Sequence, residues 1–173
     1  MLRLSLSLGL LAVTPVLSAA EEPDAGLVQT TFVTSQHITA PTGIAVSPQG
    51  VVFVSCDING VTNTHQGAGK VIRCEDTDGD GRADRFSTFV KDIDSTRCGC
   101  FVDDTLYLMQ SPFLVAYEDQ DGDGVADKKT VLVTQLGQGL RSRGVVHGPN
   151  DVRMGIDGWL YLALGDEGCF DAP

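Results

Sequence analysis

Two short segments of the sequence carry aspartates at nearly the same spacing, and both could bind a metal ion. "CEDTDGDGRAD" runs from Cys74 to Asp84, and "YEDQDGDGVAD" runs from Tyr117 to Asp127. Calcium prefers oxygen ligands at alternate positions of a loop, with a glycine at the sharp turn and a backbone carbonyl after it. Both segments have this pattern. The aspartates at candidate ligand positions are Asp76, Asp78, Asp80, Asp84, Asp119, Asp121, Asp123 and Asp127.

Both segments depart from the EF-hand loop at its last ligand position. Ser87 and Thr130 stand where that loop has a bidentate glutamate. The flanking residues also predict strands rather than helices. Aspartate and glycine are favoured in metal-free hairpin turns as well. Two interpretations follow: the segments hold structural Ca²⁺ ions, or they are polar turns without an ion.

The residues around these segments predict an all-β fold. Short β-rich runs bounded by Gly, Pro, Asp and Asn dominate after residue 25. Three segments, 43–57, 98–111 and 151–166, each predict a strand, a tight turn and a second apolar strand. Their central aromatic residues lie at equivalent positions, 54 residues apart each time: Phe53, Tyr107 and Tyr161.

A further pair of strands follows each of the first two hairpins, and the acidic segment joins the members of each pair. The first pair is "GKVIRCED" and "DRFSTFVKDI", and the second is "FLVAYED" and "DKKTVLVTQL". Repeated four-stranded antiparallel units are typical of a β-propeller, which closes with about four to eight blades. The sequence therefore predicts an incomplete β-propeller of about two and a half blades, the N-terminal part of a longer protein.

The expected boundaries follow from these units. Residues 1–20 predict a signal peptide, because Arg3 precedes an apolar stretch that ends in small residues, "SAAEEPDAG". Residues 21–40 are a lead-in, and the partial propeller occupies 41–173. Its expected divisions are a blade at 41–95, a blade at 96–140 and half a blade at 141–173.

Charge and hydropathy restrict the partners and the compartment. The formal net charge is −11, which disfavours binding to nucleic acid or to anionic lipid. The N-terminal apolar stretch is shorter than the about 20 residues of a spanning helix. We therefore expect a periplasmic or extracellular protein with no membrane span in its mature part. The odd number of cysteines leaves at least one unpaired; Cys56 and Cys74 could form a bridge or remain buried thiols.

One histidine stands out as a candidate for chemistry. His147 lies in "LRSRGVVHGPNDVRMGIDGWLYLALGDEG", ahead of a predicted inner strand, and such a loop opens onto the channel of a propeller. Asp166, at the far end of the hairpin, could orient the imidazole, and a histidine–carboxylate pair makes a general base. A turn histidine without a role fits the spacing equally well. The candidate residues for binding substrate or cofactor nearby are Arg141, Arg143 and Asn150.

The segment "HGPNDVRMGIDGWLYLALGDEG" resembles soluble pyrroloquinoline-quinone (PQQ) glucose dehydrogenases and the wider glucose/sorbosone dehydrogenase group. The resemblance implies that His147 removes the substrate hydroxyl proton and that Asp166 orients it. It also implies a scaffold role for the Gly-x-Asp turn and the aromatic strand after it. Val146 stands where that family usually has an acidic residue. The family's main PQQ- and calcium-binding residues lie in later blades, beyond Pro173.

Longer stretches resemble the opening blades of the membrane-bound dehydrogenase family of planctomycete-type bacteria. These stretches are "GIAVSPQGVVFVSCDINGVTN", "GKVIRCEDTDGDGRAD", "TLYLMQSPFLVAYEDQDGDGVAD" and "NDVRMGIDGWLYLALGD". The resemblance implies an exported, quinoprotein-like dehydrogenase that oxidises a sugar or other alcohol with PQQ. A c-type cytochrome domain or partner would accept the electrons, and these 173 residues alone would be inactive. The alternative is a non-catalytic, calcium-stabilised propeller module that binds a glycan or a protein.

Overall fold

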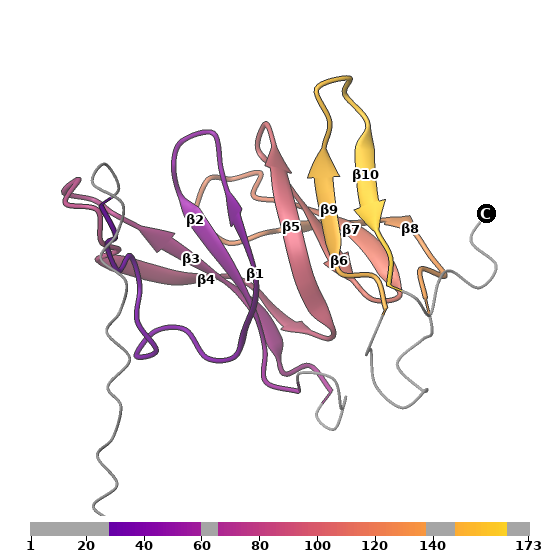
Figure 1. The fold of residues 1–173 in the computed structure, drawn as a ribbon, viewed down its shortest axis with the longest axis horizontal. Coiled ribbons are helices and arrows are strands. Elements are labelled where there is room, and N and C mark those ends of the chain that lie inside the picture. Colours follow the sequence, from indigo (N-terminus) through magenta and orange to yellow (C-terminus); the bar gives the residue numbers. More distant parts are fainter. Residues whose placement is uncertain (1–27, 60–65, 138–147, 166–173) are drawn as a thin grey trace, which may run out of the picture.

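A computed structural model describes residues 28–59, 66–137 and 148–165 of the protein. These residues form antiparallel strands and no helix, so none of them provides a long apolar helix that could cross a membrane. Two four-stranded sheets and one two-stranded hairpin lie next to one another (Figure 1). The first sheet contains β1 (Pro41–Val46), β2 (Val52–Asp57), β3 (Gly69–Glu75) and β4 (Arg85–Ile93). The second contains β5 (Thr96–Val102), β6 (Thr105–Gln110), β7 (Phe113–Glu118) and β8 (Lys128–Val133). The hairpin consists of β9 (Asp151–Met154) and β10 (Leu160–Ala163).

Each sheet is a meander in which consecutive strands pair antiparallel. Tight turns join the strands; Gly50, for example, has φ of 85° in the turn between β1 and β2, a conformation that glycine adopts without steric cost. The acidic segments form the last hairpin connection of each sheet, between β3 and β4 and between β7 and β8. The predicted four-stranded unit is therefore confirmed.

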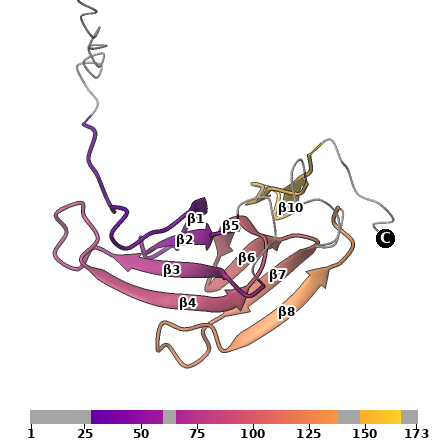
Figure 2. The same ribbon diagram turned by 90° about the horizontal axis from the view of Figure 1, so that it is seen from below.

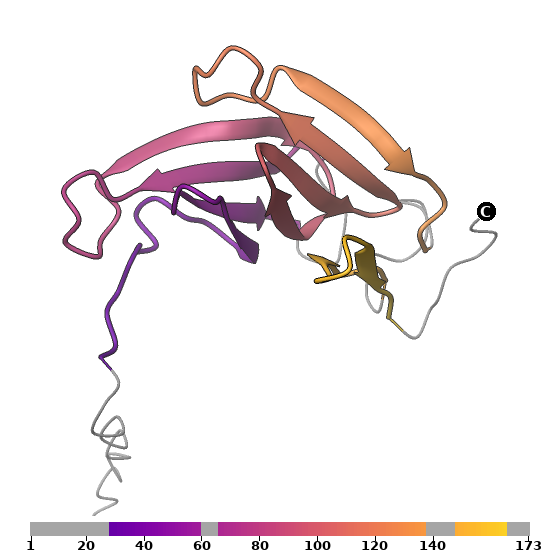
Figure 3. The same ribbon diagram turned by 90° about the horizontal axis from the view of Figure 1, so that it is seen from above.

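The sheets are arranged as the blades of a propeller. The first strands, β1, β5 and β9, lie side by side (Figure 1). The fourth strands of the two four-stranded sheets, β4 and β8, lie outermost (Figures 2 and 3). Polar contacts join the first strands: the Cys98 amide donates to the Asn150 carbonyl at 3.2 Å, and the Arg153 guanidinium donates to the Gly99 carbonyl at 3.1 Å. The all-β propeller class that the sequence predicts is thus confirmed. We call the two sheets blade 1 and blade 2, and the β9–β10 hairpin the third unit.

The main apolar core lies between blade 1 and blade 2. Phe53 is its centre, with ring centroids 4.9 Å from Phe89 and 4.4 Å from Phe101. Side chains of both blades contribute, including Val71 from β3 and Leu108 from β6, which are both fully buried. Burying one such side chain contributes about 1.5–3 kcal/mol, so this shared core fixes one blade against the other.

The opposite face of blade 1 forms a second core, which contains two cysteines. Val54, Cys56, Ile72 and Cys74 are buried there. Both thiols are free, so the structure contains buried thiols rather than a Cys56–Cys74 bridge. Burial raises the pKa of Cys74 to about 11. Because the thiolate is the reactive form, this cysteine is unreactive at neutral pH.

Phe53 and Tyr161 occupy equivalent positions in their sheets, but their side chains differ in burial. Phe53 is only 5% exposed, whereas Tyr161 is 57% exposed. Phe53 packs against blade 2, while the described residues contain no further blade beyond the third unit. Sequence equivalence therefore predicts the position in the strand, and the neighbouring blade determines the burial.

Candidate metal-binding loops and inner-strand ends

The first acidic loop folds around the carboxylate of Asp76. Its Oδ1 accepts a hydrogen bond from the Gly79 amide at 2.7 Å, and its Oδ2 accepts one from the Gly81 amide at 2.8 Å. The two glycines have φ of 77° and 85°, which turns their amides inward and disfavours other residues. The Asp84 amide closes the hairpin by donating to the Glu75 carbonyl at 2.8 Å.

The second acidic loop repeats this arrangement. Asp119 accepts hydrogen bonds from the amides of Gly122 and Gly124, both at 2.8 Å. These glycines have φ of 78° and 87°. The Asp127 amide donates to the Glu118 carbonyl at 3.0 Å. Two sequences that differ at several positions thus fold into the same loop.

Three carboxylates converge in each loop. One oxygen from each member of a group lies within 4.8 Å of the others, a separation that one cation with ligands at about 2.3–2.6 Å could bridge. The fourth predicted ligand of each loop, Asp80 or Asp123, does not join the group. Its carboxylate instead accepts the amide of Arg82 or Val125, each at 2.8 Å. The groups are Asp76, Asp78 and Asp84, and Asp119, Asp121 and Asp127.

Hydrogen bonding in the first loop favours the ionised form of Asp76. Hydrogen bonds from backbone amides, that of Gly81 first, lower the pKa of Asp76. A donor that stabilises the charged form of a carboxyl group lowers its pKa. At neutral pH the loop therefore presents an ionised carboxylate to solvent.

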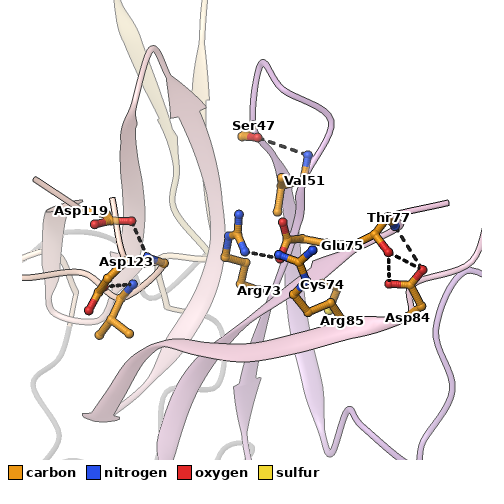
Figure 4. A network of polar contacts seen from close by, with 12 residues as sticks. Ser47, Val51, Arg73, Cys74, Glu75, Thr77, Asp84, Arg85, Asp119 and Asp123 are labelled. Atoms are coloured by element: carbon orange, nitrogen blue, oxygen red, sulfur yellow. Dashed lines mark hydrogen bonds and ion pairs between the residues drawn. The ribbon is translucent and has the colours of Figure 1, made fainter. Parts of the chain in front are cut away.

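Arg73 brings a positive charge to the second loop from blade 1. Its guanidinium lies next to Gly124, so that a Cβ atom at Gly124 would be 3.7 Å from Nη1. The same side chain forms an ion pair with Glu75 at the start of the first loop. Figure 4 shows Arg73 between the loop that carries Asp119 and the strand that carries Glu75. The two acidic loops thus have different surroundings.

The third unit positions Gly148, which follows His147 in the chain, and Gly165, which precedes Asp166. The Gly165 amide donates to the Gly148 carbonyl at 3.1 Å, and the Asn150 amide donates to the Ala163 carbonyl at 3.0 Å. Asn150 is exposed at the start of β9. The remaining predicted residues of this site lie outside the described residues: Arg141, Arg143, His147 and Asp166.

The turn of the third unit has a packed geometry that explains its Gly-x-Asp pattern. A Cβ atom at Gly155 would lie 2.5 Å from both Asp157 Oδ1 and Tyr161 Cε2. The Tyr161 hydroxyl donates to Asp157 Oδ2 at 2.7 Å. A larger residue at position 155 would therefore have to displace the tyrosine ring and the carboxylate.

Comparison with known proteins identifies a family. Residues 22–171 match the family described as "Domain of unknown function (DUF7133)". The chain belongs to this family. No curated protein matches the sequence. Among solved structures, a luciferin-regenerating enzyme is similar over 70% of this chain and 38% of its own, with 12% identity and a TM-score of 0.49. The chain thus spans well under half of that protein.

A buried ion pair in this DUF7133 chain is not evident from the sequence. Asp57, at the end of β2, is fully buried, and its Oδ2 lies 3.5 Å from Nη1 of Arg97 on β5. Its Oδ1 accepts the Asn59 amide at 3.0 Å, while Oδ2 accepts no hydrogen bond within the described residues. Burial of the guanidinium lowers the pKa of Arg97. The only sequence signal is that Asp57 directly follows an apolar run.

Proposed function

We propose that each acidic hairpin loop binds one Ca²⁺ ion and that the DUF7133 chain is a calcium-stabilised propeller segment of an exported protein. The supporting observation is the convergence of three carboxylates in both loops, with the same backbone hydrogen bonds. A plain hairpin turn needs only one aspartate and one glycine. Because the same arrangement of carboxylate oxygens occurs in both loops, ion binding explains it better than chance does.

The ion would act on the structure rather than on a reaction. Three ionised carboxylates at close distance repel one another, and a divalent cation neutralises that charge. Each loop is the only connection between the third and fourth strands of its blade. Binding would therefore hold the outer hairpin of each blade in one conformation.

The experiment is calorimetric titration of the decalcified 173-residue chain with CaCl₂, with MgCl₂ in a parallel titration. We expect two Ca²⁺ ions per chain. Asp76→Asn and Asp119→Asn should each remove one ion, because each aspartate is the central acceptor of its loop. Asp103→Asn is the matched control, because it removes the same charge from an exposed turn outside both loops. Two ions bound by both variants would contradict the assignment.

A second candidate function is dehydrogenation in the intact protein. The specific observation in its favour is the hydrogen bond between Gly165 and Gly148, whose chain neighbours are Asp166 and His147. Together with the sequence resemblance, this contact supports the proposal that His147 takes the hydroxyl proton of a sugar or alcohol and that Asp166 orients the imidazole. A c-type cytochrome would receive the electrons.

The cofactor of this candidate would be PQQ, which supplies a two-electron oxidant when it is bound. Arg141, Arg143 and Asn150 would bind substrate or cofactor. Asn150 is the only member of this set among the described residues, and its backbone amide and carbonyl are used in strand contacts. Its exposed side chain suits a hydrogen bond to a polar ligand.

The test is dye-linked oxidation of a panel of aldoses and sugar alcohols by the intact protein, with and without added PQQ. We expect His147→Ala to abolish turnover. His37→Ala is the control, because His37 stacks on Phe86 at 3.8 Å, far along the chain from the third unit. Equal rates for wild type and His147→Ala would exclude the assigned base. The isolated 173 residues should show no turnover.

A further inference from the structure

We propose that residues 31–34 are the fourth strand of a further blade, the last of the ring, and that this segment closes the propeller against blade 1. The segment precedes blade 1 and contributes to neither described sheet. Its sequence, backbone contacts and packing each match those of β4, the fourth strand of blade 1.

The first observation is a short sequence repeat. Residues 31–34 read "TFVT", and residues 88–91 in β4 read "TFVK". Both occur shortly before the first strand of a blade, β1 or β5. The segment 31–34 therefore occupies the chain position of a fourth strand, immediately before a new blade begins.

The second observation is a pair of equivalent backbone hydrogen bonds. The Ala126 amide, at the end of the acidic loop of blade 2, donates to the Phe89 carbonyl of blade 1 at 2.9 Å. The Ala83 amide, at the same position of the first loop, donates to the Phe32 carbonyl at 2.9 Å. Phe32 is thus placed against blade 1 as Phe89 is placed against blade 2.

The third observation is equivalent side-chain packing. Phe32 and Val33 pack against the core face of blade 1 that contains Ile72. Phe89 and Val90 pack against the face of blade 2 that contains the equivalent residue, Val115. Both contacts are bordered by grooves with matching linings. One groove is lined by Thr31, Phe32, Val33 and Thr34 with Arg82, Ala83 and Phe86. The other includes Thr88, Phe89, Val90 and Lys91 with Val125, Ala126 and Lys129.

The segment differs from β4 in lacking a strand partner. Thr88 of β4 pairs with Ile72 of β3, whereas residues 31–34 pair with no strand among the described residues. The Phe32 carbonyl already accepts the Ala83 amide, and the Thr34 carbonyl accepts the amides of His37 and Ile38. A segment whose other edge is unpaired can accept a strand through the amides and carbonyls on that edge. The edge that corresponds to the β3 side of β4 is therefore the docking surface, and its occupant is an antiparallel third strand.

The occupant belongs to the same molecule rather than to a second copy. Within the described part of the chain, a second copy offers unpaired sheet edges at first strands, fourth strands and one second strand: β1, β5, β9, β4, β8 and β10. None of these is a third strand. A three-stranded sheet of the same ring, supplied outside residues 1–173, satisfies both the strand order and the position beside blade 1.

The experiment is site-specific photo-crosslinking in the intact protein produced from its complete coding sequence. The photoreactive residue p-benzoylphenylalanine replaces Thr31 in one variant and Thr88 in the control. Both positions are exposed, and both begin a copy of the repeated tripeptide "TFV". Equal amounts of ¹⁴N- and ¹⁵N-labelled protein are mixed before irradiation, so that mass spectrometry separates bonds within one molecule from bonds between two.

The control should crosslink to β3, because Thr88 pairs with Ile72. The Thr31 variant should crosslink within one molecule to a peptide outside residues 1–173. Crosslinks between heavy and light copies would overturn the proposal, as would crosslinks confined to residues 1–173. Absence of any crosslink from Thr31, while Thr88 reacts, would also overturn it. If circular dichroism shows that the Thr31 variant is unfolded, the probe at Thr34 serves in its place with the same outcomes.

Discussion

Thr42 and Thr96 lie at the start of neighbouring blades, and their hydroxyl oxygens are 3.4 Å apart although 54 residues separate them in the chain. Thr96 also donates to the Cys56 carbonyl at 3.1 Å. The equivalent residue of the third unit, Asn150, accepts the Cys98 amide. The inner strands are therefore held in register by polar contacts, while the apolar cores lie farther out between the blades.

Calcium should stabilise the chain if the loops bind it. At a free concentration one hundred times the Kd, each site contributes about 2.7 kcal/mol to the free energy of unfolding. We expect chelation to lower the thermal midpoint measured by circular dichroism. The double variant Asp78→Ala/Asp121→Ala should lose this response, because it removes one oxygen ligand from each group. An unchanged melting curve of the wild-type chain on adding chelator would leave the loops as metal-free turns.

The close approach of β1 and β5 should make Gly43 intolerant of a side chain. A Cβ atom there would lie 2.6 Å from the Cα of Cys98, and backbone cannot move aside as a flexible side chain can. We expect Gly43→Ala to destabilise the chain by about 1–3 kcal/mol in urea denaturation. Ile44→Ala on the same strand, at a side chain that is 55% exposed, should cost clearly less. If the two variants lost the same free energy of unfolding, β1 and β5 would not be in close contact at Gly43.

The chain should be destabilised more by removing one partner of the buried ion pair than by removing both. Arg97→Met leaves the carboxylate of Asp57 buried without its cation, a change that costs about 3–5 kcal/mol. Adding Asp57→Asn should recover part of this loss. Arg85→Met is the control, because Arg85 is 63% exposed and 3.6 Å from Glu75, and such surface pairs contribute about 0–1 kcal/mol. Denaturation midpoints that are equal for Arg97→Met and Arg85→Met would contradict the buried pair.

The Tyr161–Asp157 hydrogen bond should be visible in the titration of the carboxyl group. The hydroxyl of Tyr161 lowers the pKa of Asp157 and the carboxylate raises the pKa of Tyr161. The stabilisation from this hydrogen bond is therefore fully present between pH about 4 and pH about 10, the ordinary pKa values of the two groups. It is lost as the pH falls through the lowered carboxyl pKa or rises through the raised phenol pKa.

We expect Tyr161→Phe to raise the pKa of Asp157 toward its ordinary value, as followed by ¹³C NMR of the side-chain carboxyl. Tyr107→Phe, at the equivalent position of blade 2, should leave that titration unchanged. An Asp157 titration that is the same in wild type and Tyr161→Phe would show that the hydroxyl does not bind the carboxylate in solution.

The strands could be predicted from the sequence because their signals are local. Alternating apolar residues, turn glycines and the spacing of Phe53, Tyr107 and Tyr161 predict the strands and their repeat. The loop aspartates could also be recognised, since ligands at alternate positions are a pattern within one segment. The separation of Asp80 and Asp123 from the carboxylate groups could not, because it depends on which backbone amides each side chain accepts.

Features that depend on contacts between blades could not be predicted in this way. Asp57 and Arg97 are far apart in the chain, and each alone resembles an ordinary charged residue at a strand end. The role of residues 31–34 required the position of Phe32 against Ala83, although the repeated "TFV" was visible in the sequence. The pairing of distant segments is set by packing, which sequence periodicity does not encode.

The shared cores have a consequence for how such a protein can change during evolution. Phe53 and Val71 of blade 1 are covered by side chains of blade 2, so a single blade excised from the chain would expose its apolar faces to water. Blades of this kind cannot be shuffled between proteins as autonomous modules. Any change in their number must therefore leave each blade with a neighbour that covers its apolar face.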